Sequence, residues 1–394
     1  MADILNGYTL LKDWTFCANG DFTTCEKSGT TYFLKRLPTP KYPIRESDYE
    51  PRTYIRLVEM CMKFEKRKIV LTNDLIEAAE ECPAIVNPYK FFRASATYYI
   101  LSRYVQDKQI AVEEVHLLKY DVKLSLIKSF ADGLVALQKK KIVHGDLKPG
   151  NVFVCQNEDG EVFLNILDFD DSYYSEHPPT CEGTVGSMEY YSPELGDYIC
   201  SEDPDRGYIV TCVSDIFAAG LMIHEYLTGE KVTNKNGKYP FQAKKDSDLK
   251  LSGSVPANMR DLLKSMLKID RSERIDAMEF QRYVEDIING VEHTPIPSGK
   301  PRLVKNPDGT FQYISSDRHS SSKVSRKMAL EIASDKGIPL EGDDAGTDAT
   351  GKGPIEEGTA VLSRTDRTIT IKTKGGITTI PISVYEQMKK EGRL

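Results

Sequence analysis

The stretch HGDLKPGN at residues 144–151 is the most informative part of this chain. It follows a segment whose apolar residues recur at steps of three and four, namely Leu126, Phe130, Leu134 and Leu137. That spacing places them on one face of a helix and predicts that the face is buried. A loop that begins directly after such a helix is held in a fixed position. Its charged and amide side chains are therefore candidates for a chemical site.

Two side chains of this loop, Asp146 and Asn151, have the chemistry that phosphoryl transfer requires. The reaction needs a carboxylate to receive the proton of the acceptor hydroxyl, and oxygen ligands to hold Mg2+ on the phosphates. Asp146 can face the acceptor while Asn151 turns back towards the metal, and Lys148 can neutralise the migrating group. A single Asp or Asn is more often a turn or cap residue. The inference therefore depends on the set as a whole.

The loop resembles the catalytic loop H-R-D-L-K-P-x-N of eukaryotic-type Ser/Thr protein kinases, a group that includes bacterial members. Downstream, LDFD at 167–170 is similar to the D-F-G segment of the same family. The resemblance implies ATP and Mg2+ as cofactors. It assigns Asp146, Lys148 and Asn151 to catalysis, and Asn151 and Asp168 to the metal.

Two positions depart from the family pattern. Gly145 replaces the arginine that reads a phosphate on the activation loop, so we expect a non-RD kinase that is not switched by that route. Asp170 replaces the last residue of D-F-G. This change removes no metal ligand, but it puts in doubt the backbone flip by which many kinases switch this segment off.

Upstream segments resemble the ATP-binding part of the family. Lys35, at the end of a predicted strand, is similar to the lysine that holds the α and β phosphates. Gly20 fits the middle of the glycine-rich loop, although Ala18 and Thr23 stand where the flanking glycines would be. The Cβ atoms at these two positions limit how closely the backbone approaches phosphate, so a modest ATP affinity is expected.

Two further groups complete the predicted ATP site. The family pairs its lysine with a helix glutamate, for which Glu65 is the predicted residue, with Glu59 and Glu77 as alternatives. ILSRYV at 100–105 resembles the strand that leads into the adenine-binding hinge. Ser102 takes the gatekeeper position there, and Tyr104 is predicted to bind the cofactor as well.

The downstream region bears on the class of substrate. H-G-D-L-x-P-G-N also occurs in small-molecule kinases of the aminoglycoside and choline kinase type. GSMEYYSPE at 186–194, however, is similar to G-T-x-x-Y-x-x-P-E, which shapes the peptide-docking surface of protein kinases. In this reading Ser187 contacts the catalytic residues, Glu194 pairs with Arg274, and Asp215 holds the backbone of the catalytic loop. A protein substrate is therefore expected.

Composition and pattern define the predicted organisation. The 394 residues are 40% hydrophobic and 28% charged, which is typical of a globular protein. We predict an α+β fold with two kinase lobes, a β-rich N-lobe and a helical C-lobe, followed by a small α/β extension. The predicted parts are an N-lobe (1–105), a C-lobe (106–290), a linker with a hairpin and a helix (291–358), and a ββα module (359–394).

Charge and hydropathy exclude several functions. The net charge of −7 argues against a chain that coats nucleic acid or an anionic membrane. No apolar run is long enough to span a bilayer, and the eight cysteines form no Cys-x-x-Cys pair, so a cytoplasmic protein with reduced thiols is expected. A regulatory partner is expected to act through the C-terminal extension.

Two alternatives to an active protein kinase stay open at this point. The incomplete glycine-rich loop and the altered D-F-G segment favour a pseudokinase or scaffold that binds partners. The shared catalytic-loop motif favours a small-molecule kinase.

Overall fold

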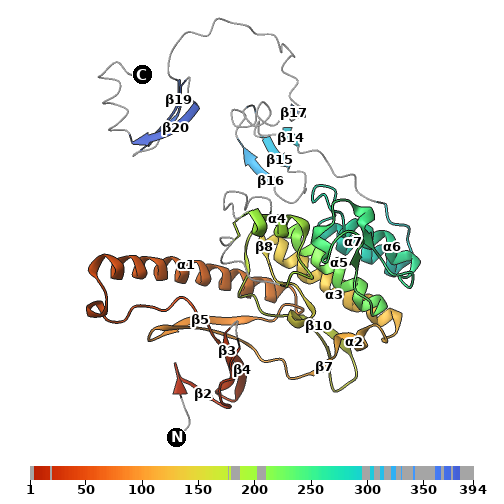
Figure 1. The fold of residues 1–394 in the computed structure, drawn as a ribbon, viewed down its shortest axis with the longest axis horizontal. Coiled ribbons are helices and arrows are strands. Elements are labelled where there is room, and N and C mark those ends of the chain that lie inside the picture. Colours follow the sequence, from red (N-terminus) through yellow and green to blue (C-terminus); the bar gives the residue numbers. More distant parts are fainter. Residues whose placement is uncertain are drawn as a thin grey trace, which may run out of the picture. The chain divides into compact units, whose positions relative to one another are not determined.

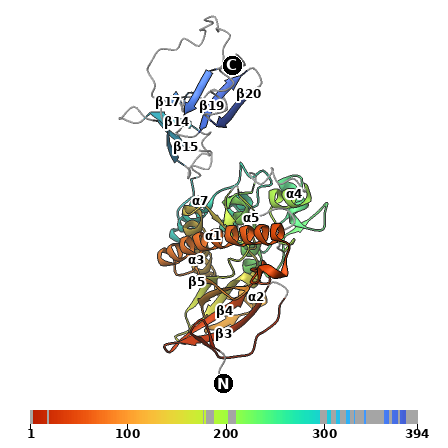
Figure 2. The same ribbon diagram turned by 90° about the vertical axis from the view of Figure 1, so that its left-hand side faces the viewer.

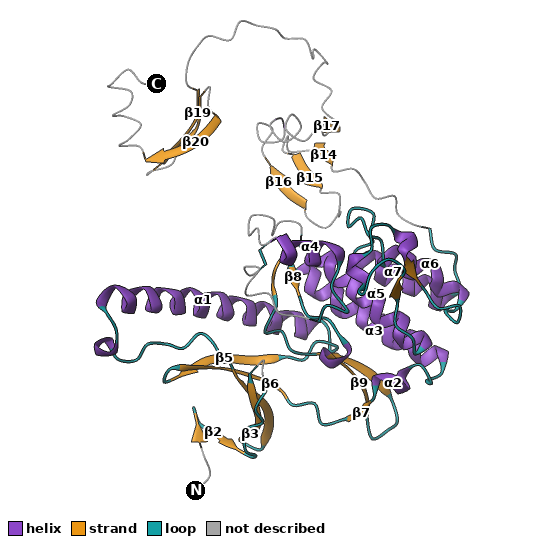
Figure 3. Cartoon of the chain, viewed as in Figure 1, coloured by secondary structure: helices purple, strands orange, loops and turns teal. Residues whose placement is uncertain are grey.

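The computed structural model describes residues 4–17, 20–175, 177–178, 187–201 and 210–294, and beyond residue 294 only short segments, most of them strands. The chain divides into two compact units, residues 1–341 and 342–394, which are described separately. In the described part, strands gather in the N-terminal lobe and helices in the C-terminal lobe (Figure 3). This is the predicted α+β architecture.

The N-lobe is built on a six-stranded antiparallel sheet in the order β1-β2-β3-β4-β6-β5. Its strands are β1 (Ile4–Leu5), β2 (Tyr8–Leu10), β3 (Asp21–Lys27), β4 (Thr30–Arg36), β5 (Pro88–Ala94) and β6 (Thr97–Arg103). The turn between β3 and β4 has positive φ at Ser28 (53°) and Gly29 (80°), the geometry that tight hairpins need. Buried side chains from one face of the sheet form its core, with Leu34 and Cys25 completely enclosed.

One long helix, α1 (Pro51–Glu81), interrupts the sheet between β4 and β5. Its proline lies at the start of the helix, where the missing N–H costs nothing. The buried residues of α1 are concentrated in its C-terminal half, at Leu71, Leu75 and Ala78. The helix contacts β5 through residues of its first half such as Phe64, whose ring lies 5.9 Å from that of Phe91. It also contacts the C-lobe helix α3 (Tyr120–Lys139), so α1 borders both lobes (Figure 1).

The C-lobe is mainly helical. Its helices are α2 (Val112–Val115), α3, α4 (Pro193–Ser201), α5 (Cys212–Thr228), α6 (Ala257–Met266) and α7 (Ala277–Asn289). Its short strands are β7 (Lys108–Ile110), β8 (Ile142–Val143), β9 (Val152–Gln156), β10 (Val162–Ile166), β11 (Tyr173–Tyr174), β12 (Thr233–Asn234) and β13 (Leu249–Lys250). Helix α5 is buried along most of its length and ends at Gly229 with φ 73°, as its apolar sequence predicts.

The two lobes are joined by backbone pairing as well as by the chain itself. The segment that precedes β5 runs beside β10, where Ile166 N donates to the Ala84 carbonyl at 2.7 Å and Val86 N donates to the Ile166 carbonyl at 2.9 Å. Arg103 at the end of β6 donates to Asn165 Oδ1 at 2.5 Å. The residues that follow β10 are therefore fixed relative to the N-lobe sheet. Figure 2 shows the N-lobe strands β3, β4 and β5 on one side of helix α1 and the C-lobe helices α4, α5 and α7 on the other.

The region after residue 294 contains more strand than the sequence predicts. In the part of the chain predicted to be a linker with a hairpin, β14 (Arg302–Lys305) and β15 (Phe311–Ile314) pair antiparallel. β16 (Ser321–Val324) and β17 (Leu340–Glu341) extend that sheet. The predicted helix at 328–333 lies almost wholly outside the described residues.

The last described strands belong to the second compact unit. β18 (Ala360–Arg364), β19 (Thr368–Thr373) and β20 (Gly376–Pro381) form a three-stranded antiparallel sheet, where the ββα prediction has two strands. The predicted terminal helix lies outside the described residues. Among the described residues, no helix is both long and apolar enough to cross a membrane.

Candidate active site

The loop 144–151 is anchored by one carboxylate. Asp215, in the first turn of α5, accepts hydrogen bonds from the backbone N–H of His144 at 2.6 Å and of Gly145 at 3.2 Å. All three groups are largely removed from solvent, so these charge-assisted bonds compete with little water. Helix α3 and strand β8 precede the loop and set its position, while Asp215 fixes its backbone.

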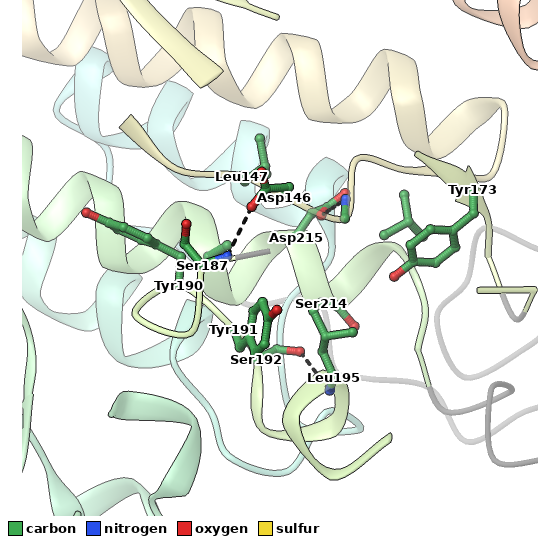
Figure 4. Close-up of a pocket in the computed structure, with 13 residues that line it drawn as sticks. Asp146, Leu147, Tyr173, Ser187, Tyr190, Tyr191, Ser192, Leu195, Ser214 and Asp215 are labelled. Carbon is green, nitrogen blue, oxygen red and sulfur yellow. Dashed lines mark hydrogen bonds between the residues drawn. The ribbon is translucent and has the colours of Figure 1, made fainter. Parts of the chain in front are cut away.

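Two side chains of the loop, those of Lys148 and Asn151, converge on the Asp146 carboxylate. Lys148 Nζ donates to Asp146 Oδ2 at 2.5 Å, and Asn151 Nδ2 donates to the same oxygen at 3.0 Å and to the Asp146 carbonyl at 2.8 Å. The backbone N–H of Ser187 donates to Asp146 Oδ1 at 3.2 Å (Figure 4). The structure therefore brings together the residues that the sequence assigned to catalysis.

A pocket lies directly beside the Asp146 carboxylate. It is lined by the catalytic loop, the start of α5 and the segment before α4, including Leu147, Ser187, Tyr190, Tyr191 and Leu195 (Figure 4). The segment 187–194, predicted to shape a docking surface, thus borders Asp146. Behind it, Arg274 binds Glu194, the pair expected from the sequence.

Lys35 is a second cation of the site, and it contacts the 168–170 segment rather than Asp146. Its Nζ lies 2.9 Å from Asp168 Oδ1, 3.0 Å from Asp168 Oδ2 and 2.6 Å from Asp170 Oδ2. Burial alone would lower the pKa of Lys35, but Asp170 and then Asp168 outweigh it and raise that pKa above its ordinary value. Lys35 is therefore held as an ammonium group.

The structure pairs Lys35 differently from the prediction. Glu65, the expected helix partner, accepts hydrogen bonds from Arg93 Nε at 3.0 Å and from the Tyr98 hydroxyl at 2.9 Å. Both of these partners belong to the N-lobe sheet, so Glu65 joins α1 to β5 and β6. The side chain of α1 that reaches the 168–170 segment is Lys68, whose Nζ donates to the Asp170 carbonyl.

The remaining predicted cofactor residues are Gly20, Ser102 and Tyr104, and of these Gly20 packs closely against Lys35. Gly20 has φ +117°, and a Cβ there would lie 2.8 Å from the Arg36 carbonyl and 3.3 Å from Lys35 Cε. Glycine is therefore required for β3 and β4 to pass this closely. Ser102 lies on β6 opposite Phe33, and Tyr104 follows at the end of that strand.

Gly145 shows why this loop has no arginine beside its aspartate. Its φ is +84°, and a Cβ would lie 2.9 Å from Tyr173 Cε1 and 3.0 Å from the Asp171 carbonyl. Tyr173 is only 1% exposed and pairs through β11 with β8, so it has no room to withdraw. A larger residue at 145 is incompatible with this backbone.

Sequence reasoning missed three residues of the site: Lys68, Asp170 and Tyr173. Asp170 was noticed only as a departure from D-F-G, although a second acidic residue so close to Asp168 is a signal that a cation lies near. Lys68 and Tyr173 carry no such local signal. Their roles depend on which face of a helix or strand turns inward.

Comparison with known proteins places this arrangement in a family. Residues 58–284, more than half of the 394, match the family described as Protein kinase domain. The chain belongs to this family. The match begins after Gly20 and Lys35, so it does not cover those two residues.

Individual relatives are distant. Aurora kinase C of Mus musculus is 24% identical over 240 residues, which cover 58% of this chain and 81% of the relative. Calcium-dependent protein kinase 4 of Plasmodium berghei is 23% identical over 224 residues, 55% of this chain and 40% of the relative. A Clostridium perfringens protein named "Probable serine/threonine-protein kinase CPE1738" is 24% identical over 225 residues, 55% of this chain and 30% of the relative.

The chain thus spans most of one relative and less than half of the other two. At the level of the family, the predicted class of Ser/Thr protein kinase and the predicted two-lobed fold are confirmed. What the whole protein phosphorylates is a matter for proposal.

Proposed function

We propose that this protein kinase transfers the γ-phosphoryl group of ATP to Ser or Thr hydroxyls of protein substrates and belongs to the non-RD type. The observation that carries the proposal is the Asp146 carboxylate, held by Lys148, Asn151 and the Ser187 N–H beside a pocket. The confined backbone at Gly145 supports the non-RD assignment, because an arginine does not fit there.

In this proposal each polar residue of the loop has one task. Asp146 accepts the proton of the substrate hydroxyl, whose oxygen forms a bond to the γ-phosphorus as the bond from that phosphorus to the leaving oxygen of ADP breaks. Lys148 lies within hydrogen-bonding distance of Asp146 and is close enough to meet the charge of the migrating group. Lys35 holds the phosphates of ATP from the other side.

The donor atoms present fit a hard divalent cation. Asn151 uses its Nδ2 on Asp146, which leaves its amide oxygen as a ligand, and the Asp168 carboxylate is about one-third exposed at the same site. Oxygen ligands of this kind suit Mg2+. When bound by Asn151 and Asp168, the ion would neutralise phosphate charge. ATP would also contact Gly20, Ser102 and Tyr104.

Phosphate transfer from labelled ATP with Mg2+ tests the proposal, using the full chain and generic protein substrates. Asp146→Asn is expected to lower kcat by about 10²–10⁴-fold, because it removes the proton acceptor while keeping the shape. Asp159→Asn, an exposed hairpin residue, is the matched control and should retain full activity.

The alternatives give different results in the same experiment. If the wild-type protein labels neither itself nor a protein, the proposed activity is wrong. Binding of Mg-ATP without transfer, seen as a raised Tm, would then indicate a scaffold. Transfer to a metabolite and not to protein would indicate a small-molecule kinase.

Two further expectations belong to this proposal. A regulatory partner would bind the C-terminal extension, and deletion of residues 291–394 followed by activity and pull-down assays tests this. The cytoplasmic location is a prediction that fractionation of cells expressing the full chain can check.

A further inference from the structure

Two lysines and two aspartates meet where the chain leaves β10. Lys35 comes from β4 and Lys68 from α1, while Asp168 and Asp170 belong to the segment that follows β10. Asp170 Oδ2 lies 2.6 Å from Lys35 Nζ, and the side chains of Lys35 and Asp170 are only 11% and 17% exposed. Lys68 Nζ donates to the backbone carbonyl of Asp170. The carboxylate of Asp170 is thus held against one lysine while its backbone is held by the other.

The polarity of this cluster is the opposite of the one expected from the family pattern. There, the helix supplies an anion for the lysine and the third residue of D-F-G has no charge. Here, the helix supplies the cation Lys68 and the loop supplies the anion Asp170. The two changes compensate each other. A lysine at position 68 alone would place a second cation near Lys35, and an aspartate at position 170 alone would place an additional anion beside the helix glutamate. In either case like charges would lie close together with little solvent to screen them.

The two aspartates also differ in exposure. The Asp168 side chain is 36% exposed, about twice as exposed as that of Asp170. A carboxylate engaged by a metal ion has less charge to offer a lysine. If Asp168 serves the metal, as the proposed function requires, Asp170 is the carboxylate that stays with Lys35. Each aspartate then has its own cation.

We propose that Asp170 is the positioning residue for Lys35, in the place of a helix glutamate, and that Lys68 is the positioning residue for Asp170. This inference deepens the proposed function and rests on it. Lys68 then links α1 to the 168–170 segment, so movement of α1 changes the position of Lys35 through Asp170. Desolvation by burial lowers the pKa of the Lys68 ammonium group, and the carboxylates of Asp170 and Asp171 partly offset that effect.

An exchange of charges between positions 68 and 170 tests the proposal. We expect each of Asp170→Gly and Lys68→Glu to lower kcat/KM for ATP by about 10- to 100-fold. Asp170→Gly removes the partner of Lys35, and Lys68→Glu adds a surplus anion near Lys35. The double variant places the carboxylate on the helix and glycine in the loop. We expect it to recover to within about fivefold of the wild type, far above the product of the two single effects.

Further measurements separate positioning from loss of structure. The KM for the protein substrate should stay unchanged in all variants, since the pocket beside Asp146 is not altered. Asp170→Asn keeps the volume of the side chain and serves where Asp170→Gly does not fold. Glu65→Gln is the control on the same helix. It should leave kcat/KM for ATP within about twofold, because Glu65 faces Arg93 and Tyr98.

Two results would overturn the inference. One is a normal kcat/KM for ATP in both Asp170→Gly and Asp170→Asn. The other is a double variant no better than the product of the single variants. If the wild-type protein binds Mg-ATP but transfers no phosphate, only the proposed function fails. The wild type, Asp170→Gly, Lys68→Glu and the double variant are then compared by their Kd for ATP. We expect weaker binding in each single variant and recovered binding in the double variant.

Discussion

Arg274 and Glu194 form a two-pronged ion pair in the interior of the C-lobe. Arg274 Nη1 lies 2.6 Å from Glu194 Oε1 and Nη2 lies 3.0 Å from Oε2, with side-chain exposures of 0% and 6%. Ser214 donates a further hydrogen bond to Glu194 at 2.8 Å. Burial alone would raise the pKa of Glu194, but Arg274 outweighs it and lowers that pKa. The pair fixes the start of α4, and with it the docking segment beside Asp146.

Removal of the arginine should destabilise the C-lobe strongly. Arg274→Met leaves a buried, unpaired carboxylate, and we expect the free energy of unfolding to fall by about 3–5 kcal/mol. Urea denaturation measures this. The double variant Arg274→Met with Glu194→Met should recover much of the loss, because two apolar side chains can replace the pair.

The matched control is a pair that is more exposed to solvent. Arg282 and Glu279 lie 2.7 Å apart within one helix, with Arg282 about one-third exposed. Arg282→Met should therefore cost less than about 1 kcal/mol. Equal losses for Arg274→Met and Arg282→Met would contradict this account of the buried pair.

A side chain at position 145 should distort the catalytic loop. Gly145→Ala forces a positive φ on a residue with a Cβ and brings that atom 2.9 Å from the Tyr173 ring. We expect a loss of stability of about 1–3 kcal/mol from strain, and a lower kcat because Asp146 is the next residue. Gly145→Arg should be worse, and it should not create a switch that responds to phosphate.

Thermal unfolding and kinase assays check this prediction against Gly253→Ala. A Cβ at position 253 would have nothing within 4 Å, and the backbone there has no positive φ. That variant should behave as the wild type. A fully active Gly145→Arg protein would show that the loop accepts an arginine after all.

The site was predictable where its chemistry is local in sequence. The loop at 144–151, the aspartate at 168 and the docking segment at 186–194 are short motifs in which each residue acts beside its sequence neighbours. Their placement needs only that α3, β8 and α5 pack as their apolar patterns require. The structure accordingly brings Asp146, Lys148 and Asn151 together.

The partner of Lys35 was not predictable in the same way. It depends on the rotation of α1, and each residue along a helix turns the side chain by about 100°. Glu65 and Lys68 are three positions apart and therefore lie within about 60° of each other around the helix. A small difference in rotation thus decides which of them contacts the sheet and which contacts the 168–170 segment. The N-terminal half of α1 has few buried residues to reveal which face is inward. The short strands after residue 294 gave an equally weak pattern.

Asp215 should make both stability and activity depend on pH near 6. Burial raises the pKa of its carboxyl to about 6, although His144 and the two backbone N–H groups act against that rise. The folded protein therefore holds a proton that the unfolded chain, with a pKa near its ordinary value of 3.8, has released. Stability from this group is greatest below about pH 4 and is lost as pH rises towards 6, by about 3 kcal/mol in total.

Activity should follow the opposite course. Only the ionised carboxylate accepts both backbone hydrogen bonds of the loop, so kcat should fall as pH drops through about 6. Urea denaturation of the wild type and of Asp215→Asn between pH 4.5 and 7.5 isolates the effect, since other groups titrate in both proteins and cancel. Relative to the variant, the wild type should lose stability as pH rises. A difference that does not change with pH would show that Asp215 is ionised throughout, and the anchoring of the loop would then be independent of pH.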